Sequence, residues 1–312
     1  MDLSNDEMFI QRIKTLNETI WEHKAKGSAI LDWLGNFCDE KEKSHALYLL
    51  SKFIYFGERQ IKEMLKALYR DLYKYPIIEK IRKDNADVLD IRFINDSFAV
   101  ENDKTRFLGM GNPSESGAFL LYYFRQINNL RKNLFVSGHE IFMGDPSSGS
   151  MKIMDDTVQR YVFIDDFCGS GRQAVGYAAR LVYAIKRLNP SAKTYYFSLF
   201  GTEKGLNRIR KRTCFDQVAS VSVFDSSFKC FEKNSRYFLD TNSEIQRDYA
   251  KEMCKKYGMK WFKDYPNDLL GFDDGQLLLG FRHNIPDNTI PIIWQCEDWQ
   301  PIFLRYQKIY GG

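Results

Sequence analysis

The sequence predicts an α/β protein, in which an open and mostly parallel β-sheet follows a helical N-terminal region. Three observations support this fold class. Apolar side chains recur at helical spacing over the first 85 residues, short β-rich runs alternate with helical runs after residue 87, and Gly-containing turns separate them. We therefore expect a helical region over residues 1–87 and an α/β domain over residues 88–312.

Four helices are expected in the N-terminal region, over residues 4–27, 29–37, 45–56 and 61–75. The first begins with a capping box, because Ser4 is followed by Glu7 three residues later, and Gly27 is expected to end it. Pro76 is expected to stop the fourth. These helices carry no chemical motif, so we expect them to contact a partner protein or to form a homo-oligomer.

In the α/β part, the β-rich runs cover residues 88–94, 134–137, 161–165, 194–200 and 218–224. Helices are expected over residues 118–129, 172–188 and 204–212. This alternation favours parallel strands with helices on both faces of the sheet. In such sheets ligands bind outside the carboxyl ends of the strands, so we expect the functional site there.

The composition excludes several classes of protein. An apolar fraction of 44% and a charged fraction of 28% are typical of globular chains and exclude a disordered one. The 6 Cys and 4 His residues are scattered, without the spacing of a zinc finger or a disulfide framework. A net charge of +4 is too small to indicate nucleic-acid binding. The aromatic share of 15% indicates a large core, a stacking surface, or both.

The chain is expected to be cytoplasmic and to make no contact with a membrane. It has no apolar run of about 18 residues, the length that a transmembrane helix needs. It begins Met-Asp-Leu-Ser-Asn-Asp-Glu, which is acidic and lacks the apolar stretch of a signal peptide.

The strongest local signal is the segment from Tyr161 to Gln173, with the sequence YVFIDDFCGSGRQ. A run typical of a buried strand leads into two adjacent acids, Asp165 and Asp166, and a Gly-Ser-Gly turn then opens a helix. Glycines let backbone N–H groups turn toward an anion, and the start of the helix adds partial positive charge. The segment therefore predicts a phosphate site beside two carboxylates.

Each part of this segment has an expected role. The phosphate is expected at the turn and the first helical residues, which are Gly169, Ser170, Gly171, Arg172 and Gln173. Asp165 and Asp166 are the expected catalytic acids, which accept hydrogen bonds from sugar hydroxyls or hold Mg²⁺ through water. Together these residues describe a pocket for a ribose 5-phosphate. We expect Mg²⁺ to bind with the substrate, and we expect no tightly bound organic cofactor.

The segment resembles the phosphoribosyl-pyrophosphate loop of type I phosphoribosyltransferases, in which apolar residues, two acids and a Thr-Gly phosphate loop follow one another. The resemblance implies that Asp165 and Asp166 bind the ribose hydroxyls. It also implies that Ser170 and Gly171 take the place of the Thr-Gly pair at the 5-phosphate.

Two residues depart from the pattern of that family. Gly169 occupies the position at which purine-salvage members carry a catalytic acid, so that position supplies no general base here. Gln173 replaces the usual final Thr and removes one phosphate-binding hydroxyl. These departures leave a second interpretation open, in which the fold has lost turnover and serves as a nucleotide sensor or as a scaffold in a protein–nucleic acid complex.

Two upstream segments fit the same resemblance by position. The loop that contacts pyrophosphate in that fold corresponds to Ser114, Glu115, Ser116 and Gly117. The polar stretch 144–156, which includes Lys152, falls where a mobile loop closes over the substrate. A Gly-rich surface loop without function is an equal alternative for this second stretch.

The C-terminal segment 280–294 is dense in polar and turn residues inside an apolar frame. Together with the acid-acid-Gly-Ser-Gly block, it resembles the phosphoribosyltransferase-like effector family of bacterial conflict and antiphage systems, including some retron-type operons. The resemblance covers roughly residues 88–305. It implies a toxin effector that is restrained by partners encoded nearby, such as a reverse transcriptase with its nucleic acid or a DNA-binding protein.

Several side chains are candidates for contact with a base or substrate, namely Phe167, Arg282, His283 and Asn284. A structural role in a turn is an equal alternative for the last two. Further rings that are candidates for base stacking are Phe281, Trp294 and Trp299.

Five cations stand close together at Lys204, Arg208, Arg210, Lys211 and Arg212. A solvated helix face accounts for them, and so does a contact with nucleic acid or a protein. The sequence therefore leaves two main functions open. One is an enzyme that acts at the anomeric carbon of a ribose, and the other is a binding module with the same fold.

Overall fold

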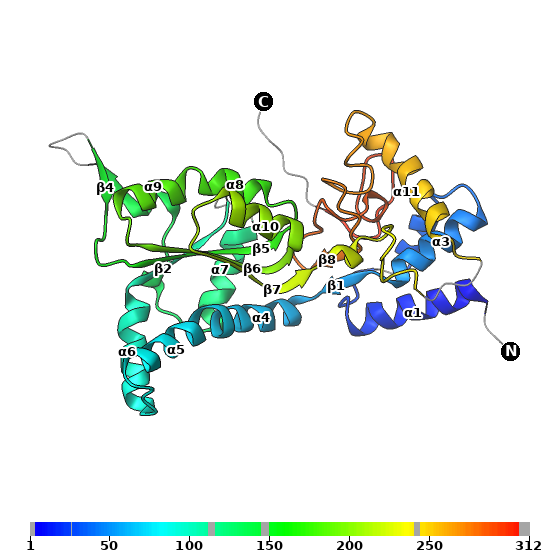
Figure 1. Ribbon diagram of the computed structural model, residues 1–312. Coiled ribbons are helices and arrows are strands. Elements are labelled where there is room, and N and C mark those ends of the chain that lie inside the picture. The colour runs from blue at the N-terminus through cyan, green and yellow to red at the C-terminus, as the bar shows by residue number, and fades with distance from the viewer. Residues whose placement is uncertain (1–3, 26, 112–115, 145–149, 240–243, 306–312) are drawn as a thin grey trace. The chain divides into compact units, whose positions relative to one another are not determined.

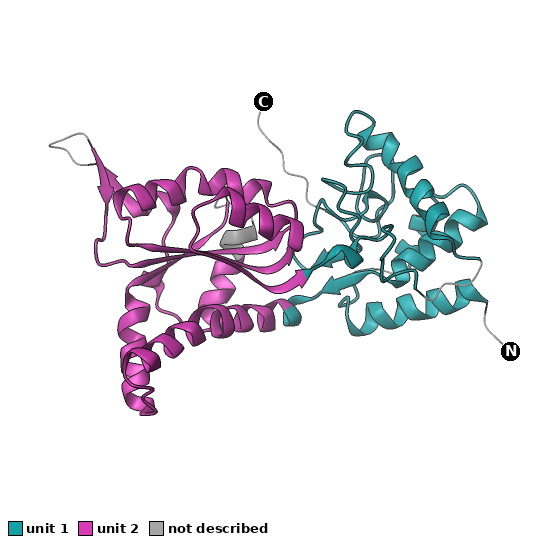
Figure 2. Ribbon diagram, in the orientation of Figure 1, with its two compact units in different colours: residues 1–60, 224–312 teal, residues 61–223 magenta. Residues whose placement is uncertain are grey.

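The computed structural model describes residues 4–25, 27–111, 116–144, 150–239 and 244–305 (Figure 1). It confirms the predicted fold class, an α/β protein with N-terminal helices and a mostly parallel sheet. The chain forms two compact units (Figure 2). Unit 1 combines residues 1–60 with residues 224–312, and unit 2 comprises residues 61–223. Among the described residues, no helix is long and apolar enough to cross a membrane.

Unit 1 is built from both ends of the chain. Its elements are α1 (Asn5–Thr19), α2 (Ala29–Leu34), α3 (Glu40–Ser51), β1 (Ile54–Phe56), η4 (Ser226–Phe228), α11 (Arg247–Phe262), β8 (Leu279–Phe281) and η5 (Pro291–Ile293), where η marks a helix that is not α-helical. β1 and β8 pair in parallel, with Tyr55 opposite Gly280. The helix α4 (Glu58–Ala67) leads from unit 1 into unit 2.

One aromatic core joins the two segments of unit 1. Trp33 from α2 and Trp299 from the C-terminal segment both donate their indole N–H to Ile292 O, at 2.7 and 2.9 Å. Phe37 lies edge-on to Tyr257 and to Trp299, with ring centroids 5.4 and 5.3 Å apart. The N-terminal helices thus bury their apolar faces against the C-terminal segment. For this reason the division into units differs from the boundary at residue 87 that the sequence predicts.

Unit 2 contains the main sheet. Its further helices are η1 (Leu68–Lys74), α5 (Tyr75–Asp84), α6 (Ile91–Asp103), α7 (Ser116–Ile127), η2 (Lys132–Leu134), η3 (Gly138–Ile141), α8 (Arg172–Ala178), α9 (Leu181–Leu188) and α10 (Glu203–Arg212). Its strands are β2 (Thr105–Gly109), β3 (Phe142–Gly144), β4 (Met151–Ile153), β5 (Arg160–Cys168), β6 (Lys193–Thr202) and β7 (Gln217–Phe224). The main sheet has the order β2-β5-β6-β7, and β2 and β6 are parallel to β5. β3 and β4 form a separate antiparallel ribbon.

Helices cover both faces of the main sheet (Figure 1). On one face α8, α9 and α10 pack on a cluster that includes Phe163 and Tyr196. On the other face Phe107 of β2 packs on Tyr73 of η1 and on Phe124 of α7, with ring centroids 5.0 and 5.3 Å apart. Because both faces are covered, the carboxyl ends of the strands are where we expect a ligand, as in other open α/β sheets.

Most predicted elements around this edge are confirmed. The runs 161–165, 194–200 and 218–224 lie within β5, β6 and β7, and the run 204–212 lies within α10. The helix predicted over 118–129 corresponds to α7. The capping box of α1 is also present, since Ser4 N donates to Glu7 Oε2 at 2.8 Å and Glu7 N donates to Ser4 Oγ at 3.3 Å.

Two predictions between residues 76 and 94 are wrong. The run 88–94 is not a strand, because Asp90 accepts hydrogen bonds from Arg92 N and Phe93 N, at 2.8 and 3.3 Å, and so caps the start of α6. Pro76 does not stop a helix but lies in the first turn of α5. The helical backbone continues through it, since the π-helix η1 runs directly into α5.

The ends of two N-terminal helices also differ from the prediction. α1 ends at Thr19 rather than at Gly27, because Glu22 and His23 adopt left-handed φ values of 52° and 55°. α3 ends at Ser51, and the following residues form β1 because their backbone pairs with β8. The pairing partner lies more than 200 residues away, so local periodicity could not reveal it.

Two predicted elements of unit 2 are interrupted. The helix expected over 172–188 is broken between α8 and α9, where Arg180 N donates to Tyr177 O at 3.2 Å in a tightened turn. The run 134–137 contributes only one isolated bridge, from Phe135 to Phe107. Neither change moves the residues of the predicted phosphate segment.

Candidate functional site

The paired acids lie in the last part of β5. β2 pairs with β5 only as far as Ile164, opposite Gly109, whereas β6 pairs on to Cys168, opposite Gly201. The end of β5, residues 165–168, therefore borders an edge that β2 does not cover. This edge is the carboxyl end of parallel strands, where ligands of such sheets bind.

Asp165 is bound to the interior of unit 2. The hydroxyl of Tyr196, on β6, donates to Asp165 Oδ2 at 2.7 Å, and the amide of Asp166 donates to Asp165 Oδ1 at 3.0 Å. Tyr196 itself is fully buried. Burial first, and then the charge of Asp166, raise the pKa of Asp165 well above its ordinary value of 3.8. Asp165 therefore holds a proton more readily than a free aspartate.

Asp166 is the second, half-buried acid. Its Oδ1 accepts a hydrogen bond from Phe167 N at 2.8 Å, and its side chain is hydrogen-bonded to that of Asp165. The two neighbouring carboxyl groups therefore do not lose their protons independently. Opposite Asp165 on β6, the buried hydroxyl of Ser198 has no hydrogen-bond partner among the described residues. The acid pair thus lies beside a hydroxyl that has no hydrogen-bond partner among the described residues.

The turn Gly169–Gly171 follows β5 and lies against the first turn of α10. Gly171 has a left-handed φ of 72°, and a Cβ atom there would lie 2.6 Å from Gly205 O. A Cβ atom on Gly205 would lie 2.3 Å from Gly169 O. Cβ atoms do not approach backbone oxygens so closely, so both positions need glycine for this packing.

Two side chains bind the carbonyl groups of this turn. Thr202 Oγ1 donates to Gly169 O at 2.6 Å, and Arg208 Nη1 donates to Ser170 O at 2.5 Å. No cis peptide bond occurs among the described residues, and in a trans peptide the N–H points opposite to the C=O. The amides of Ser170 and Gly171 therefore point away from α10, as a cradle for a phosphate requires.

The first residues of α8 complete the predicted phosphate segment. Arg172 and Gln173 have exposed side chains, and Arg172 N donates to Ser170 Oγ at 3.4 Å. Phe167, next to the acids in the chain, is half-buried. The structure thus places the whole segment 165–173 at one edge of unit 2. The ligand roles of its residues stay predictions.

The predicted pyrophosphate loop is described only in part. Ser114 and Glu115 lie outside the described residues, and Ser116 and Gly117, whose backbone alone is described, form the start of α7. This helix packs on β2 and β5, the strand that carries the acids. Lys152 is exposed on β4, and residues 145–149 before that strand lie outside the described residues.

The C-terminal candidates belong to unit 1, whereas the acid pair belongs to unit 2. Arg282 Nε lies 3.6 Å from Glu22 Oε2. The ring of His283 stacks on that of Phe281, with centroids 5.6 Å apart, and Asn284 Oδ1 is buried without a hydrogen-bond partner among the described residues. These contacts give Arg282 and His283 partners within unit 1. Contact of Arg282, His283 and Asn284 with a base stays a prediction.

The large rings of the C-terminal segment do not form a stacking surface. Phe281, Trp294 and Trp299 are 3%, 7% and 5% exposed. The indole N–H of Trp294 donates to Thr289 O at 2.8 Å. These rings could stack on a base only if the core of unit 1 opened, so base stacking is the wrong interpretation for them. Phe167 is the candidate ring that lies beside the acids.

The sequence analysis missed three residues that shape the site, Tyr196, Thr202 and Gly205. Tyr196 lies in a run typical of a buried strand, and nothing in that run indicates a hydroxyl aimed at an acid. Thr202 has the signal of an N-cap, which it is, since its Oγ1 accepts from Gly205 N at 2.9 Å. Its second role, toward the turn, depends on a contact across 33 residues.

Two of the five clustered cations, Arg208 and Arg210, form hydrogen bonds within unit 2. Arg208 binds the turn, and Arg210 donates to Val218 O at 3.0 Å and to Asn207 Oδ1 at 2.9 Å. Lys204 is exposed on the first turn of α10. These contacts favour a structural role for two of the five cations over a contact with nucleic acid.

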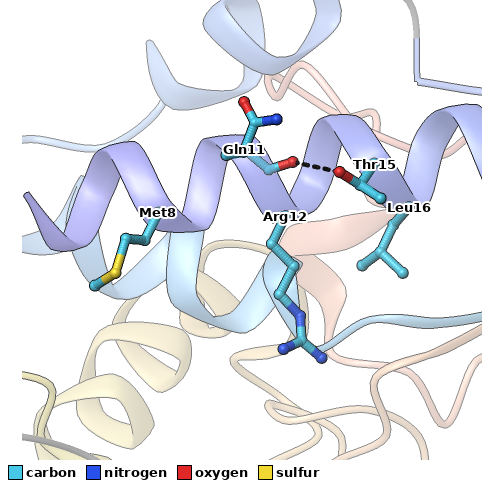
Figure 3. A pocket seen from close by; sticks show the side chains of 5 residues that line it. All are labelled: Met8, Gln11, Arg12, Thr15 and Leu16. Carbon is cyan, nitrogen blue, oxygen red and sulfur yellow. Dashed lines mark hydrogen bonds between the residues drawn. The ribbon is translucent and has the colours of Figure 1, made fainter. Parts of the chain in front are cut away.

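A hollow of about 470 Å³ lies along α1 in unit 1 and is lined by Met8, Gln11, Arg12, Thr15 and Leu16 (Figure 3). Arg12 Nε donates to Ser51 O at 2.8 Å, and Thr15 Oγ1 donates to Gln11 O at 3.0 Å. The hollow thus holds no acid pair and no nucleophile, and its polar groups bind the protein itself. We assign it no role in the site.

Among the described residues, no group of three or more His, Cys, Asp or Glu side chains could hold a metal ion. Two adjacent carboxylates suit Mg²⁺ only when a phosphate-bearing ligand and water complete its coordination. The acid pair fits that arrangement, because it stands beside the turn expected to bind phosphate.

Comparisons with known proteins found one family model and several solved structures. Residues 30–305 match the family model described as PRTase-CE, and this range includes all of unit 2 and residues 30–60 and 224–305 of unit 1. A solved Helicobacter pylori xanthine-guanine-hypoxanthine phosphoribosyltransferase is 10% identical, with 55% of this chain and 88% of that chain covered and a TM-score of 0.28. A hypothetical protein from Neisseria gonorrhoeae with bound ppGpp is 11% identical, with 65% and 96% covered and a TM-score of 0.25. No curated protein matches the sequence.

Proposed function

Because the chain belongs to the PRTase-CE family, we propose that it binds a 5-phosphoribosyl donor or a nucleotide at residues 165–173 of unit 2. We further propose that it acts at the anomeric carbon of the bound ribose. One observation carries the proposal. The acid pair and the turn that presents its amides lie next to each other at the carboxyl-end edge of the sheet.

The two parts of the site do different work in this proposal. The amides of Ser170 and Gly171 hold the 5-phosphate, and the acid pair accepts hydrogen bonds from the ribose hydroxyls. Breaking the bond at the anomeric carbon places positive charge on the ribose, and negative charge on the acid pair stabilises it. Asp165 is anchored by Tyr196, so Asp166 is the acid with more freedom to follow the ligand.

Mg²⁺ fits the proposal as a cofactor that arrives with the ligand. Asp165 and Asp166 would hold it together with phosphate oxygens and water. When bound, the ion neutralises charge on a pyrophosphate leaving group. Since the pKa of Asp165 is raised, Mg²⁺ competes with a proton for this carboxylate, and its binding should strengthen as the pH rises.

The test is a titration of the protein with 5-phosphoribosyl pyrophosphate and Mg²⁺ by calorimetry, in the wild type and in the double variant Asp165→Asn with Asp166→Asn. We expect the double variant to lose affinity by roughly 100-fold or more, because each hydrogen bond to a charged group contributes about 1.5–3 kcal/mol. The matched control is Asp96→Asn, which changes an exposed acid on α6. Wild-type affinity in the double variant would refute the proposal.

A second candidate function is a nucleotide sensor or scaffold without turnover. Gly169 supplies no catalytic acid, and both oxygens of Asp165 are engaged within the protein, which favours binding over chemistry. Mass spectrometry of wild-type protein incubated with the donor and candidate acceptors separates the two functions. Products that depend on Asp166 support the enzyme, and tight binding without products in the assembled complex supports the sensor.

We also propose that the chain is a toxin effector of a bacterial antiphage defence system, restrained by an operon-encoded protein partner. A reverse transcriptase with its nucleic acid and a DNA-binding protein are the two partner types we propose. The resemblance of residues 165–173 and 280–294 to such effectors supports this role. Expression alone should stop bacterial growth, co-expression with the partner should restore it, and the double acid variant should be harmless. A double variant that stays toxic would refute the proposal that toxicity depends on the acid pair.

A further inference from the structure

A cluster of four reactive side chains lies in unit 1, outside the proposed nucleotide site. It consists of Cys38, Glu42, Lys256 and Tyr257. Cys38 stands just before α3, Glu42 lies in the first turn of that helix, and the other two residues lie on α11. The cluster therefore connects the N-terminal helices with the C-terminal segment of unit 1.

Glu42 fixes the other members of the cluster. Its side chain is 6% exposed, and its carboxylate accepts hydrogen bonds from Lys256 Nζ at 2.7 Å, from the Tyr257 hydroxyl, and from Cys38 N at 3.0 Å. Burial alone would raise the pKa of Glu42, but these hydrogen bonds hold it below its usual range. A buried, ionised carboxylate thus keeps the amine of Lys256 at a defined position.

The thiol of Cys38 lies against the same two donors. Its Sγ atom is 3.5 Å from Lys256 Nζ and 3.5 Å from the Tyr257 hydroxyl oxygen. Cys38 is exposed, so a small oxidant can reach the sulfur from solvent. Two groups held in contact react as if each were present at very high concentration, because the entropy of bringing them together is already lost.

We propose that Cys38 and Lys256 form a covalent modification site for a peroxide oxidant. Hydrogen peroxide first converts the Cys38 thiol to a sulfenic acid. In this step the O–O bond breaks, one oxygen goes to sulfur, which gives up two electrons, and the other oxygen leaves as water. The Lys256 nitrogen then attacks this sulfur, the S–O bond breaks, and a second water leaves as the S–N bond of a sulfenamide forms.

The second step is a condensation and consumes no further oxidant. The ammonium group of Lys256 first passes one proton to Glu42, 2.7 Å away, and then to solvent, which leaves a neutral amine with an electron pair for the attack. As the S–N bond forms, the nitrogen gives a second proton to the leaving hydroxyl, which becomes water. Glu42 is therefore a positioning residue that also accepts the first proton. A thiol reductant reverses the link by attacking the sulfur and releasing the amine.

The link would join residues that are 218 positions apart in the chain, with all of unit 2 between them. A crosslink of this kind restricts the unfolded chain far more than the folded one, and so it stabilises the fold. Oxidation would in this way fasten the two segments of unit 1 together without changing the acid pair of unit 2.

The experiment treats the full-length protein with hydrogen peroxide and analyses its peptides by mass spectrometry before and after a thiol reductant. We expect a reducible pair of peptides joined through Cys38 and Lys256, with the mass of the two peptides less two hydrogens, and a higher Tm of the oxidised protein. The exposed thiols of Cys214 and Cys296 serve as internal references for general oxidation.

Variants on α11 provide a matched control. Lys255→Arg changes the neighbouring lysine, which pairs with Glu252 at 2.8 Å, and should keep the link and the rise in Tm. Lys256→Arg keeps the positive charge but should lose both, and Glu42→Gln should slow the link several-fold. Oxidation of Cys38 to sulfinic acid without a link in the folded wild type overturns the proposal, as does a link that persists in Lys256→Arg.

Discussion

Residues 165–173 and residues 280–299 are similar in residue types but differ in their structural roles. Both mix polar, turn and aromatic residues within apolar runs. The first segment ends an inner strand, past the end of its neighbour β2, and its turn presents backbone amides. The second buries its rings in the core of unit 1. Position at the carboxyl end of a parallel strand, rather than density of polar and aromatic residues, marks a candidate site.

The two segments also differ in what their polar groups bind. In the first, Thr202 and Arg208 donate hydrogen bonds to carbonyl groups of the turn, so that its amides face outward. Burial also raises the pKa of Asp165. In the second, the indole N–H groups of Trp294 and Trp299 bind backbone carbonyls nearby. The first segment therefore keeps groups that suit a ligand, and the second uses its groups for packing.

The largest expected effect lies in the second segment and concerns stability. Trp299→Ala removes a buried ring that packs on Phe37, Tyr257 and Trp261, and should lower the free energy of unfolding by about 3–5 kcal/mol. The affinity of the remaining folded protein for a phosphoribosyl ligand should stay unchanged. Denaturant unfolding and calorimetry at low temperature measure both quantities. Lost affinity in a fully folded variant would break the comparison.

The next effect lies in the first segment. Gly205→Ala would place a Cβ atom 2.3 Å from Gly169 O, and should cost about 1–3 kcal/mol of stability and most of the ligand affinity. Gly176→Ala on α8 is the matched control. A Cβ atom there meets nothing within 4 Å, so stability should be unchanged or higher by up to about 1 kcal/mol. Equal effects of the two changes on ligand binding would argue against the packed turn.

A smaller effect depends on pH. The folded-state pKa of Asp165 is raised, so the folded protein binds more protons than the unfolded one, and stability falls as the pH rises from about 3.8 toward that pKa. Asp165→Asn removes this titration while keeping an acceptor for Tyr196. We expect the variant to gain stability over the wild type with rising pH, by about 1.4 kcal/mol for each unit of the shift, while ligand binding weakens. Thermal unfolding between pH 5 and 8 measures it, and parallel Tm curves would show that Asp165 is not buried as described.

The smallest effect tests whether the second segment reaches the ligand at all. Arg282→Ala removes an exposed partner of Glu22, and stability should change by less than about 1 kcal/mol. If Arg282 contacts a base, as the sequence predicts, affinity for a nucleotide should fall several-fold while affinity for ribose 5-phosphate stays constant. Titrations with the two ligands decide this. If the substitution leaves the affinity for each of the two ligands unchanged, Arg282 does not belong to the site.

The sequence alone predicted the part of the fold that depends on local patterns. β5, β6, β7 and α10 were within reach because buried strands and amphipathic helices repeat at short periods. The division into units could not be predicted from local patterns. It depends on Trp33 and Trp299, which share one core although they are 266 positions apart in the chain. The β-branched run 88–94 likewise led to the wrong prediction of a strand, because Asp90 caps a helix there.

The candidate site was predicted in the same uneven way. The acids and the turn are contiguous, so the strand-acid-glycine order was enough to locate them. Tyr196, Thr202 and Gly205 act on this segment from the next strand and helix, and their roles arise from packing that no local pattern contains. Besides the N-cap signal of Thr202, the glycine at the start of α10 was an available signal, because glycine there has no helix-forming advantage.

The most direct test of the central claim is hydrogen exchange of the full-length protein with and without 5-phosphoribosyl pyrophosphate and Mg²⁺, read by mass spectrometry. The peptide that contains residues 169–173 should gain protection when the ligand binds, because the amides of Ser170 and Gly171 donate to its phosphate, and the buried peptide 290–299 should not change. Protection confined to other peptides, with residues 169–173 unaffected at saturating ligand, would contradict the account.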